Sequence, residues 1–433
     1  MAKRKNKIKK LKQNVKKIFK IAGPGIITGA SDDDPSGIAT YLQTGAQFGY
    51  GQLWTVLLSL PFLTAIQEAA ARIGAVTGQG LAAVIKKHYS KKVLFISLIL
   101  MLAANTINIG ADLGAMAASL RLLVPVNFIV ATLGFTAFIL ILEITTSYRI
   151  YARILKWLAL ALLSYPVTVL LVHQPWHTII RATLLPHFEF TFAFFFIITG
   201  VIGTTISPYM FFWEASEEVE EEKKKHIFRR SGQPRGLAKL IKTLHWDNFL
   251  GMLFSQIVAW CVIVTAATVL NHNGLFNVAT AADAAKALEP LVRTFPNAGL
   301  VAKFIFSLGI IGLGLLAVPV LSGSASYALS EAVDWRAGLN LKFKKAHGFY
   351  GIIILATLVG LLINFIGINP MKALIFTAVF NGVVAVPFVF LITRISSNRE
   401  IMGSYRNGLM SRILLWGTFL IMAASAIIAL AMM

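Results

Sequence analysis

The chain has 433 residues, of which 57% are hydrophobic and 14% are charged, and its formal net charge is +21. A soluble protein carries about a quarter charged residues, so this composition excludes an ordinary soluble domain and favours an integral membrane protein. The single cysteine, Cys261, excludes an intramolecular disulfide and a thiolate metal cage.

Apolar residues gather in blocks that are long enough to cross the hydrocarbon core of a bilayer as helices. We predict eleven spans, at roughly Ile21–Ala46, Gly51–Val76, Val93–Leu123, Asn127–Ile144, Ile150–Val172, Phe190–Trp213, Trp246–Leu270, Leu300–Leu321, Gly348–Ile368, Pro370–Ile392 and Met410–Met432. They follow a basic tail at 1–20 and form a first repeat at 21–172, a second repeat at 190–392 and a last span at 410–433. Because each repeat has an odd number of spans, the second must be inverted relative to the first.

The positive charge follows the order of these spans. Ten of the first twenty residues are Lys or Arg, and most other basic residues fall in alternate loops. This pattern predicts a multi-pass protein of the inner (plasma) membrane, with a cytoplasmic N-terminus and an extracytoplasmic C-terminus. We therefore expect the tail to contact anionic lipid, and we expect no nucleic-acid partner.

Two of the predicted spans are interrupted at matching places. The first span of the first repeat contains Pro35 within Gly29–Gly37, and the first span of the second repeat contains Pro208 within Gly203–Met210. Unwound backbone at membrane depth is tolerated where it is buried in protein or lines a cavity. Paired breaks in corresponding halves predict the substrate site of a secondary transporter.

Asp34 is the leading candidate site residue. A carboxylate inside a membrane segment is costly and marks function by default. The half-helix before Pro35 would present carbonyl groups and the negative end of its dipole, and both favour a cation. Asp32, Asp33 and Asp34 cannot all face one ion, because successive helical residues point about 100° apart. Asp32 and Asp33 either line a vestibule, pair with a base or bind the ion.

Several motifs together resemble the NRAMP family of divalent metal transporters. The segments are Gly23–Gly25 with Asp34–Gly37, Gly49–Trp54, Gly74–Gly78 and Gly203–Pro208, in the family's order. The resemblance implies an all-α, LeuT-like fold with a 5+5 inverted repeat and broken helices 1 and 6. It also implies alternating access for a divalent cation, which would be the substrate and not a cofactor.

The resemblance also implies a ligand set with departures. Asp34 matches the family's ion-binding aspartate, and the backbone carbonyl of Thr204 matches a carbonyl ligand. Gly37 stands where the family has an asparagine ligand, and Ser207 stands where it has a methionine. Tyr209 replaces the histidine that follows the second proline.

These departures favour a hard cation. Thioether sulfur suits softer transition metals, whereas carboxylate, carbonyl and water suit Mg²⁺, Ca²⁺ and Mn²⁺. Ser207 exchanges sulfur for oxygen, and Gly37 removes a ligand and leaves space. Mg²⁺ keeps several waters and is held by one or two carboxylates. We therefore expect Mg²⁺ first and Mn²⁺ next, as in the magnesium-transporting branch related to NRAMP proteins.

We expect proton coupling to be weak or absent. No histidine falls well inside a predicted span, so no buried imidazole relay is visible. The family's acidic pair on the third helix corresponds to Asn108 and Ala111, and Asp112 is displaced by one residue toward another helix face. Asp112 and Tyr209 are candidate residues of the ion pathway. Asn381 in the tenth span either lines the ion path or packs between helices.

Two further groups of charges are predicted to be structural. Glu68 and Arg72 lie four residues apart on one helix face and should form an internal ion pair. The acidic run at 217–222, which precedes three lysines, is expected to form a short solvated helix in the cytoplasmic connection 214–245.

Two other functions remain open on the sequence. One is a proton-coupled Mn²⁺/Fe²⁺ importer that has replaced its methionine. The other is a LeuT-fold carrier of a cationic organic substrate, or a membrane protein that has lost transport. No nucleophile–base constellation or phosphate loop is present, so we expect no enzyme and no cofactor. We expect a monomer whose partners are a divalent metal ion and the lipid bilayer.

Overall fold

The computed structural model describes residues 33–146, 160–224, 236–339 and 341–432, and within these ranges it contains helices and no strands. The basic tail at 1–20, the start of the first predicted span and the start of the fifth lie outside the described residues. The prediction of an all-α fold is confirmed.

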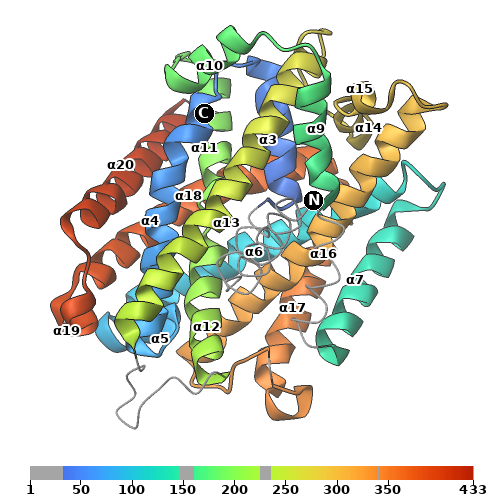
Figure 1. The fold of residues 1–433 in the computed structure, drawn as a ribbon. Helices are drawn as coiled ribbons and strands as arrows, with labels where there is room; N and C mark the ends of the chain where they lie inside the picture. The colour runs from blue at the N-terminus through green and yellow to red at the C-terminus, as the bar shows by residue number, and fades with distance from the viewer. Residues whose placement is uncertain (1–32, 147–159, 225–235, 340, 433) are drawn as a thin grey trace, which may run out of the picture.

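The helices follow the predicted order (Figure 1). The first half contains α3 (Pro35–Phe48), α4 (Trp54–Thr77), α5 (Leu81–His88), α6 (Lys91–Leu120), α7 (Phe128–Thr145), η1 (Leu160–Leu163), α9 (Ser164–Leu171) and α10 (Trp176–Leu184). The second half contains α11 (Phe192–Thr205), α12 (Pro208–Lys224), α13 (Leu237–Ala266), η2 (Ala267–Asn271), α14 (Ala281–Lys286), α15 (Glu289–Val292), α16 (Ala298–Ala332), η3 (Phe343–Lys345), α17 (His347–Ile363) and α18 (Pro370–Ser397). The chain ends with α19 (Arg399–Met402), η4 (Gly403–Tyr405) and α20 (Leu409–Ala431).

Each predicted span contains a described helix. Within the described residues, 8 helices are long and apolar enough to cross a membrane, and Ala161–Leu171 and His347–Ile363 are shorter apolar helices. Several helices continue past the apolar block that predicted them. For example, α16 ends at Ala332 and not near Leu321, because Ser and Ala residues that tolerate the helix follow the apolar stretch.

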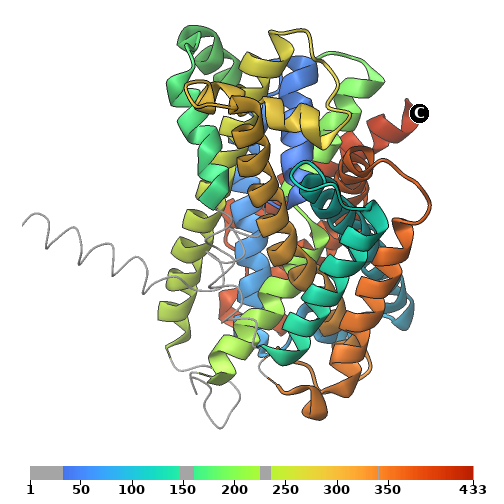
Figure 2. The ribbon, with the colours of Figure 1, turned by 90° about the vertical axis from the view of Figure 1, so that its right-hand side faces the viewer.

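The long helices form a bundle with two distinct ends (Figures 1 and 2). The short helices α10, α14 and α15 lie at one end, and α20 also finishes there (Figure 1). The short helices α5 and α19 lie at the other end (Figure 1). In the interior, α3 packs against α11, α13 and α18, while α6 packs against α16, α17 and α18.

The outward faces of the peripheral helices are apolar. On α7, Val130 and Ile141 are each 60% exposed, and on α20 Leu420 and Ile427 are similarly exposed. A helix that is hydrophobic on all sides belongs in a protein core or in a membrane. These faces are therefore the surfaces that would meet lipid.

Small residues bring α11 and α18 into backbone contact. A Cβ atom added to Gly203 would lie 2.2 Å from the carbonyl oxygen of Ala378 and 2.3 Å from the backbone nitrogen of Gly382. Glycine is the only residue that permits this approach, as is common where membrane helices pack closely. The contact fixes the helix that ends at the second break against its neighbour.

The acidic run after Trp213 does not form a solvated helix, contrary to expectation. It continues α12 without interruption to Lys224, and Glu214, Glu218 and Glu222 are buried. Glu220 accepts hydrogen bonds from the Tyr327 hydroxyl at 2.5 Å and from a backbone N–H in the segment after α16 at 2.8 Å. Glutamate favours helix, and packing against α4 and α16 buries this face.

The predicted ion pair in α4 is confirmed. Arg72 Nη1 lies 3.7 Å from Glu68 Oε1, and the other oxygen of Glu68 lies 2.9 Å from Nδ1 of His245 on α13. Arg72 also donates to the side-chain oxygen of Asn407, just before α20. These contacts tie α4 to two neighbouring segments, which is a structural role.

Candidate metal site

Asp34 begins helix α3 and is buried at its N-terminus. Its Oδ1 accepts hydrogen bonds from the backbone N–H of Gly37 at 2.8 Å and from the Ser36 hydroxyl at 2.6 Å. Aspartate is a favoured N-cap residue, and Pro35 suits the first helical position because its missing N–H would have no helical partner there. The sequence around the first break thus starts a helix whose positive dipole end stabilises the carboxylate.

The second oxygen of Asp34 is held by α6. Asn108 Nδ2 donates to Asp34 Oδ2 at 2.9 Å. Asp112, one turn further along the same face of α6, is fully buried and interacts electrostatically with Asp34. Asp112 is displaced by one residue from the family's acidic position, and it shares the helix face of Asn108, because residues four apart lie on one face.

The second break lies between α11 and α12. In a continuous helix the Thr204 carbonyl would accept from the backbone nitrogen of residue 208, but Pro208 has no N–H. Ser207 Oγ donates instead to the carbonyl oxygens of Thr204 and Gly203, each at 2.8 Å. A carbonyl and a hydroxyl each keep acceptor lone pairs after such a bond. Both Thr204 and Ser207 can therefore still offer oxygen to a cation.

The two breaks face each other across Gly37. A Cβ atom added to Gly37 would lie 3.0 Å from Thr204 Oγ1. We expected Gly37 to leave open volume, but the Thr204 hydroxyl lies against that position. Tyr41 on α3 adds a second link, because its hydroxyl lies 3.3 Å from Thr205 Oγ1.

Several buried oxygens around Asp34 have no hydrogen-bond partner among the described residues. They are Thr204 Oγ1, Asn108 Oδ1 and both carboxylate oxygens of Asp112. Leaving a buried polar atom without a partner costs about 1–3 kcal/mol, so such atoms call for water or an ion. The donor set is rich in oxygen, which suits a hard cation.

The other predicted site residues are placed differently. Asp33 is buried and accepts a hydrogen bond from Ser255 on α13 at 3.2 Å, so it faces another helix than Asp34 does. Tyr209 and Asn381 are buried in α12 and α18 and are not among the hydrogen-bond partners of Asp34. Asp32 lies outside the described residues, as does the half-helix that would precede Pro35.

Sequence reasoning missed Asn108 as a candidate site residue and considered Thr204 only for its backbone carbonyl, as a metal ligand. The spacing of Asn108 and Asp112 was the available signal, since two polar residues one turn apart inside an apolar helix share a face. Nothing in the sequence indicated that the Thr204 side chain would lie against Gly37. Within the described residues, no group of three His, Cys, Asp or Glu side chains could hold a metal.

Comparison with known proteins gives a consistent result. The family model described as natural resistance-associated macrophage protein-like (Nramp) matches residues 25–432. A divalent metal cation transporter MntH from Verminephrobacter eiseniae is 25% identical over 396 residues, which cover 90% of this chain and 84% of that protein. MntH from Ralstonia nicotianae is 24% identical over 427 residues, covering 95% and 90%.

Solved structures share the fold. The crystal structure of a manganese transporter from Eremococcus coleocola, bound to an aromatic bis-isothiourea compound, matches with a TM-score of 0.75 and 15% identity. The match covers 95% of this chain and 85% of that one. MhsT in complex with L-phenylalanine matches with a TM-score of 0.61 and 11% identity, covering 95% and 98%. The fold is thus that of Nramp and LeuT-like transporters.

Proposed function

We propose that this chain, which belongs to the natural resistance-associated macrophage protein (Nramp) family, carries hard divalent cations across a membrane. We expect Mg²⁺ to be the preferred ion and Mn²⁺ the next. Members of this family are metal-ion transporters and not enzymes. The curated relatives are named divalent metal cation transporters. What remains to be proposed is the ion, the direction and the coupling.

The observation that carries the choice of ion is the oxygen of Ser207 at the second break. It lies within hydrogen-bond distance of the Thr204 carbonyl, at the position where the family has a methionine sulfur. Among the described residues, the hydrogen-bond partners of Asp34 are a hydroxyl, a backbone N–H and a side-chain amide. Oxygen donors favour Mg²⁺ and Mn²⁺ over softer metals.

The unpartnered acceptors support an ion that keeps part of its water. Mg²⁺ dehydrates reluctantly and usually retains several water molecules when a protein binds it. Thr204 Oγ1 and Asn108 Oδ1 are buried without a partner among the described residues. They can accept hydrogen bonds from waters on an ion held by Asp34, so direct ligands can be few.

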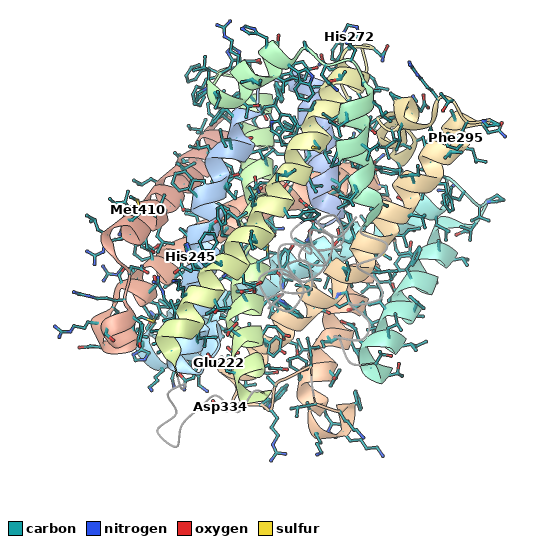
Figure 3. The ribbon with its side chains drawn as sticks, in the orientation of Figure 1. Glu222, His245, His272, Phe295, Asp334 and Met410 are labelled. Carbon is teal, nitrogen blue, oxygen red and sulfur yellow. The ribbon has the colours of Figure 1, made fainter. Side chains whose placement is uncertain are left out.

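The proposed mechanism is alternating access with import toward the cytoplasm. The interrupted helix α11–α12 contacts α3, so a movement of one half against the other would expose the site to each side in turn. His272 and Phe295 lie at one end of the bundle, and Glu222 and Asp334 lie at the other (Figure 3). The charge pattern of the loops assigns the end with Asp334 and Lys86 to the cytoplasm.

Weak or absent proton coupling is proposed because the side chain that donates a hydrogen bond to Asp34 Oδ2 cannot titrate. Asn108 donates to Asp34 Oδ2 through a side-chain amide, which neither gains nor loses a proton at physiological pH. In the described part of the spans, the only histidine with a contact to an acid is His245, which is half exposed and pairs with Glu68 near one end of the bundle. A coupled transporter would need a buried group that releases a proton when the metal enters, and the buried carboxyl group of Asp112 is the one that would serve the alternative function.

A proton-coupled Mn²⁺/Fe²⁺ importer remains the second candidate, and one observation favours it. Met116 lies one turn beyond Asp112 on α6. A Cβ atom added to Gly314 would contact both the Met116 sulfur and the ring of Pro35, so this sulfur lies near the first break. A thioether near the first break could restore affinity for softer metals. Transport of Cd²⁺ that is lost in Met116→Leu would support this candidate.

The experiment that separates the two is uptake by purified protein in liposomes loaded with a pH-sensitive dye. We expect uptake of Mg²⁺ and Mn²⁺, poor uptake of Cd²⁺ and little internal acidification. Strong acidification during metal entry would contradict the proposal on coupling. Preference for Cd²⁺ over Mg²⁺ would contradict the proposal on the ion.

A further inference from the structure

An apolar cavity of about 270 Å³ lies between α4, α11 and α20. These three helices pack against one another, and Figure 1 shows them on the left of the bundle. Protein interiors seldom leave voids larger than a water molecule. An engineered apolar cavity of about 150 Å³ in another protein binds benzene. The cavity is therefore large enough for an apolar ligand.

The lining of the cavity offers almost nothing to a polar ligand. Its polar side chains already have partners within the protein. Trp54 Nε1 donates to the His187 carbonyl, and the Ser59 hydroxyl donates to the Gln256 side chain. The hydroxyls of Thr55, Thr418 and Ser425 donate to the carbonyls of Gln52, Leu414 and Met422, respectively. A buried water needs two to four polar partners. The occupant that fits this chemistry is apolar.

The cavity opens toward the surface that would meet lipid. Leu58 on α4 is 42% exposed and Ala424 on α20 is also exposed, whereas Ile206 and Met422 are each 1% exposed and lie deep in the cavity. The exposed side chains Leu420 and Ile427 extend the same apolar face along α20. Leu58 and Ala424 both lie inside helices that are long and apolar enough to span a membrane, α4 and α20, so the opening between them would face the hydrocarbon core.

We propose that this cavity is a binding site for an acyl chain of a membrane phospholipid, which enters sideways between α4 and α20. The hydrocarbon core of the bilayer supplies acyl chains at that depth, and the surface around the opening is continuous with the lipid-facing surface. The chain would contact Ile202 and Ile206, the latter in the break between α11 and α12 and directly before Ser207. An acyl chain in the cavity would thus pack against the end of α11, next to the second break.

Trp54 provides a local probe of this site. It lines the cavity and is only 7% exposed, so lipid outside the cavity has little access to its ring. In liposomes made with phospholipid that carries brominated acyl chains, bromine quenches tryptophan fluorescence on contact. The chain has 8 tryptophans, so the contribution of Trp54 is obtained by subtracting the signal of Trp54→Phe.

We expect brominated lipid to quench the Trp54 contribution in the unmodified protein. Ala424→Phe, which places a ring at the opening, should remove at least half of that quenching. Ile413→Phe is the matched control, because it adds a similar ring at an exposed position of α20 that is 11 residues from Ala424 and does not line the cavity, and it should leave the quenching unchanged. Absence of Trp54 quenching would overturn the proposal and indicate an empty cavity or another occupant. Equal quenching in the two phenylalanine variants would also overturn it.

Discussion

At the scale of single residues, the chemistry of the site depends on two prolines, each of which changes the backbone hydrogen bonding of a helix. Pro35 lets Asp34 start a helix and hold its carboxylate against Ser36 and Gly37. Pro208 leaves the Thr204 carbonyl without its helical donor, and Ser207 supplies a hydroxyl in its place. The side chain at position 207 therefore decides whether the second break offers oxygen or sulfur.

Ser207→Met should move ion preference toward softer metals. The substitution adds a thioether and removes the two hydrogen bonds to Gly203 and Thr204. We expect the ratio of Cd²⁺ to Mg²⁺ uptake to rise about tenfold, which corresponds to about 1.4 kcal/mol. Ser207→Ala is the control, because it loses the same hydrogen bonds without adding sulfur. A ratio that rises equally in both variants would speak against a role for sulfur.

Asn108→Asp should introduce proton coupling. The new carboxyl group would lie 2.9 Å from Asp34 Oδ2, the distance of the present hydrogen bond, and close to Asp112. Like charges at this separation cannot all remain ionised, so one carboxyl group would hold a proton, which a metal bound at Asp34 would displace toward the liposome interior. We expect acidification of the liposome interior to accompany metal uptake at least twice as strongly as in the unmodified protein. Asn108→Leu, which cannot titrate, should show no such gain.

At the scale of helices, the site depends on close packing of the interrupted helix. Helix α11 reaches the break while pressed against α18 through Gly203 and Gly382. Helix α6, which also packs against α18, supplies Asn108 and Asp112. It is fixed to α16 by hydrogen bonds from Asn105 to the Leu321 carbonyl and the Ser324 hydroxyl, each at 2.8 Å. The end of α11 and the helix that supplies Asn108 are thus held by their neighbours.

Gly203→Ala should destabilise the protein strongly. The added methyl group would meet backbone atoms of α18 at 2.2 and 2.3 Å, and backbone cannot yield as a flexible side chain can. We expect a loss of about 3 kcal/mol or more, seen as a lower unfolding temperature in detergent. Gly134→Ala on α7 is the control, since no atom lies within 4 Å of the added methyl group. Similar unfolding temperatures for the two variants would contradict this account of the packing.

At the scale of the whole molecule, hydropathy and charge predicted the class of fold, because the bilayer dictates span length and loop charge. The all-α, LeuT-like fold and the Nramp family are confirmed. The sequence singles out Asp34 and the two prolines as candidate site residues, since an acid and helix breakers are conspicuous in apolar segments. The role of Asn108 and the burial of Glu214 and Glu218 were not predictable, because they depend on which helices meet.

The central claim is that Asp34 holds a hard divalent cation between the two breaks. The most direct test is Mg²⁺ uptake by liposomes containing Asp34→Asn, with Asp334→Asn as the control at an exposed position. Asparagine keeps the shape of the side chain and removes its charge, and an interaction with a charged group is worth about 1.5–3 kcal/mol. We predict that uptake falls at least about tenfold in Asp34→Asn and stays near the unmodified level in Asp334→Asn. Unchanged Mg²⁺ uptake by correctly folded Asp34→Asn would contradict the claim.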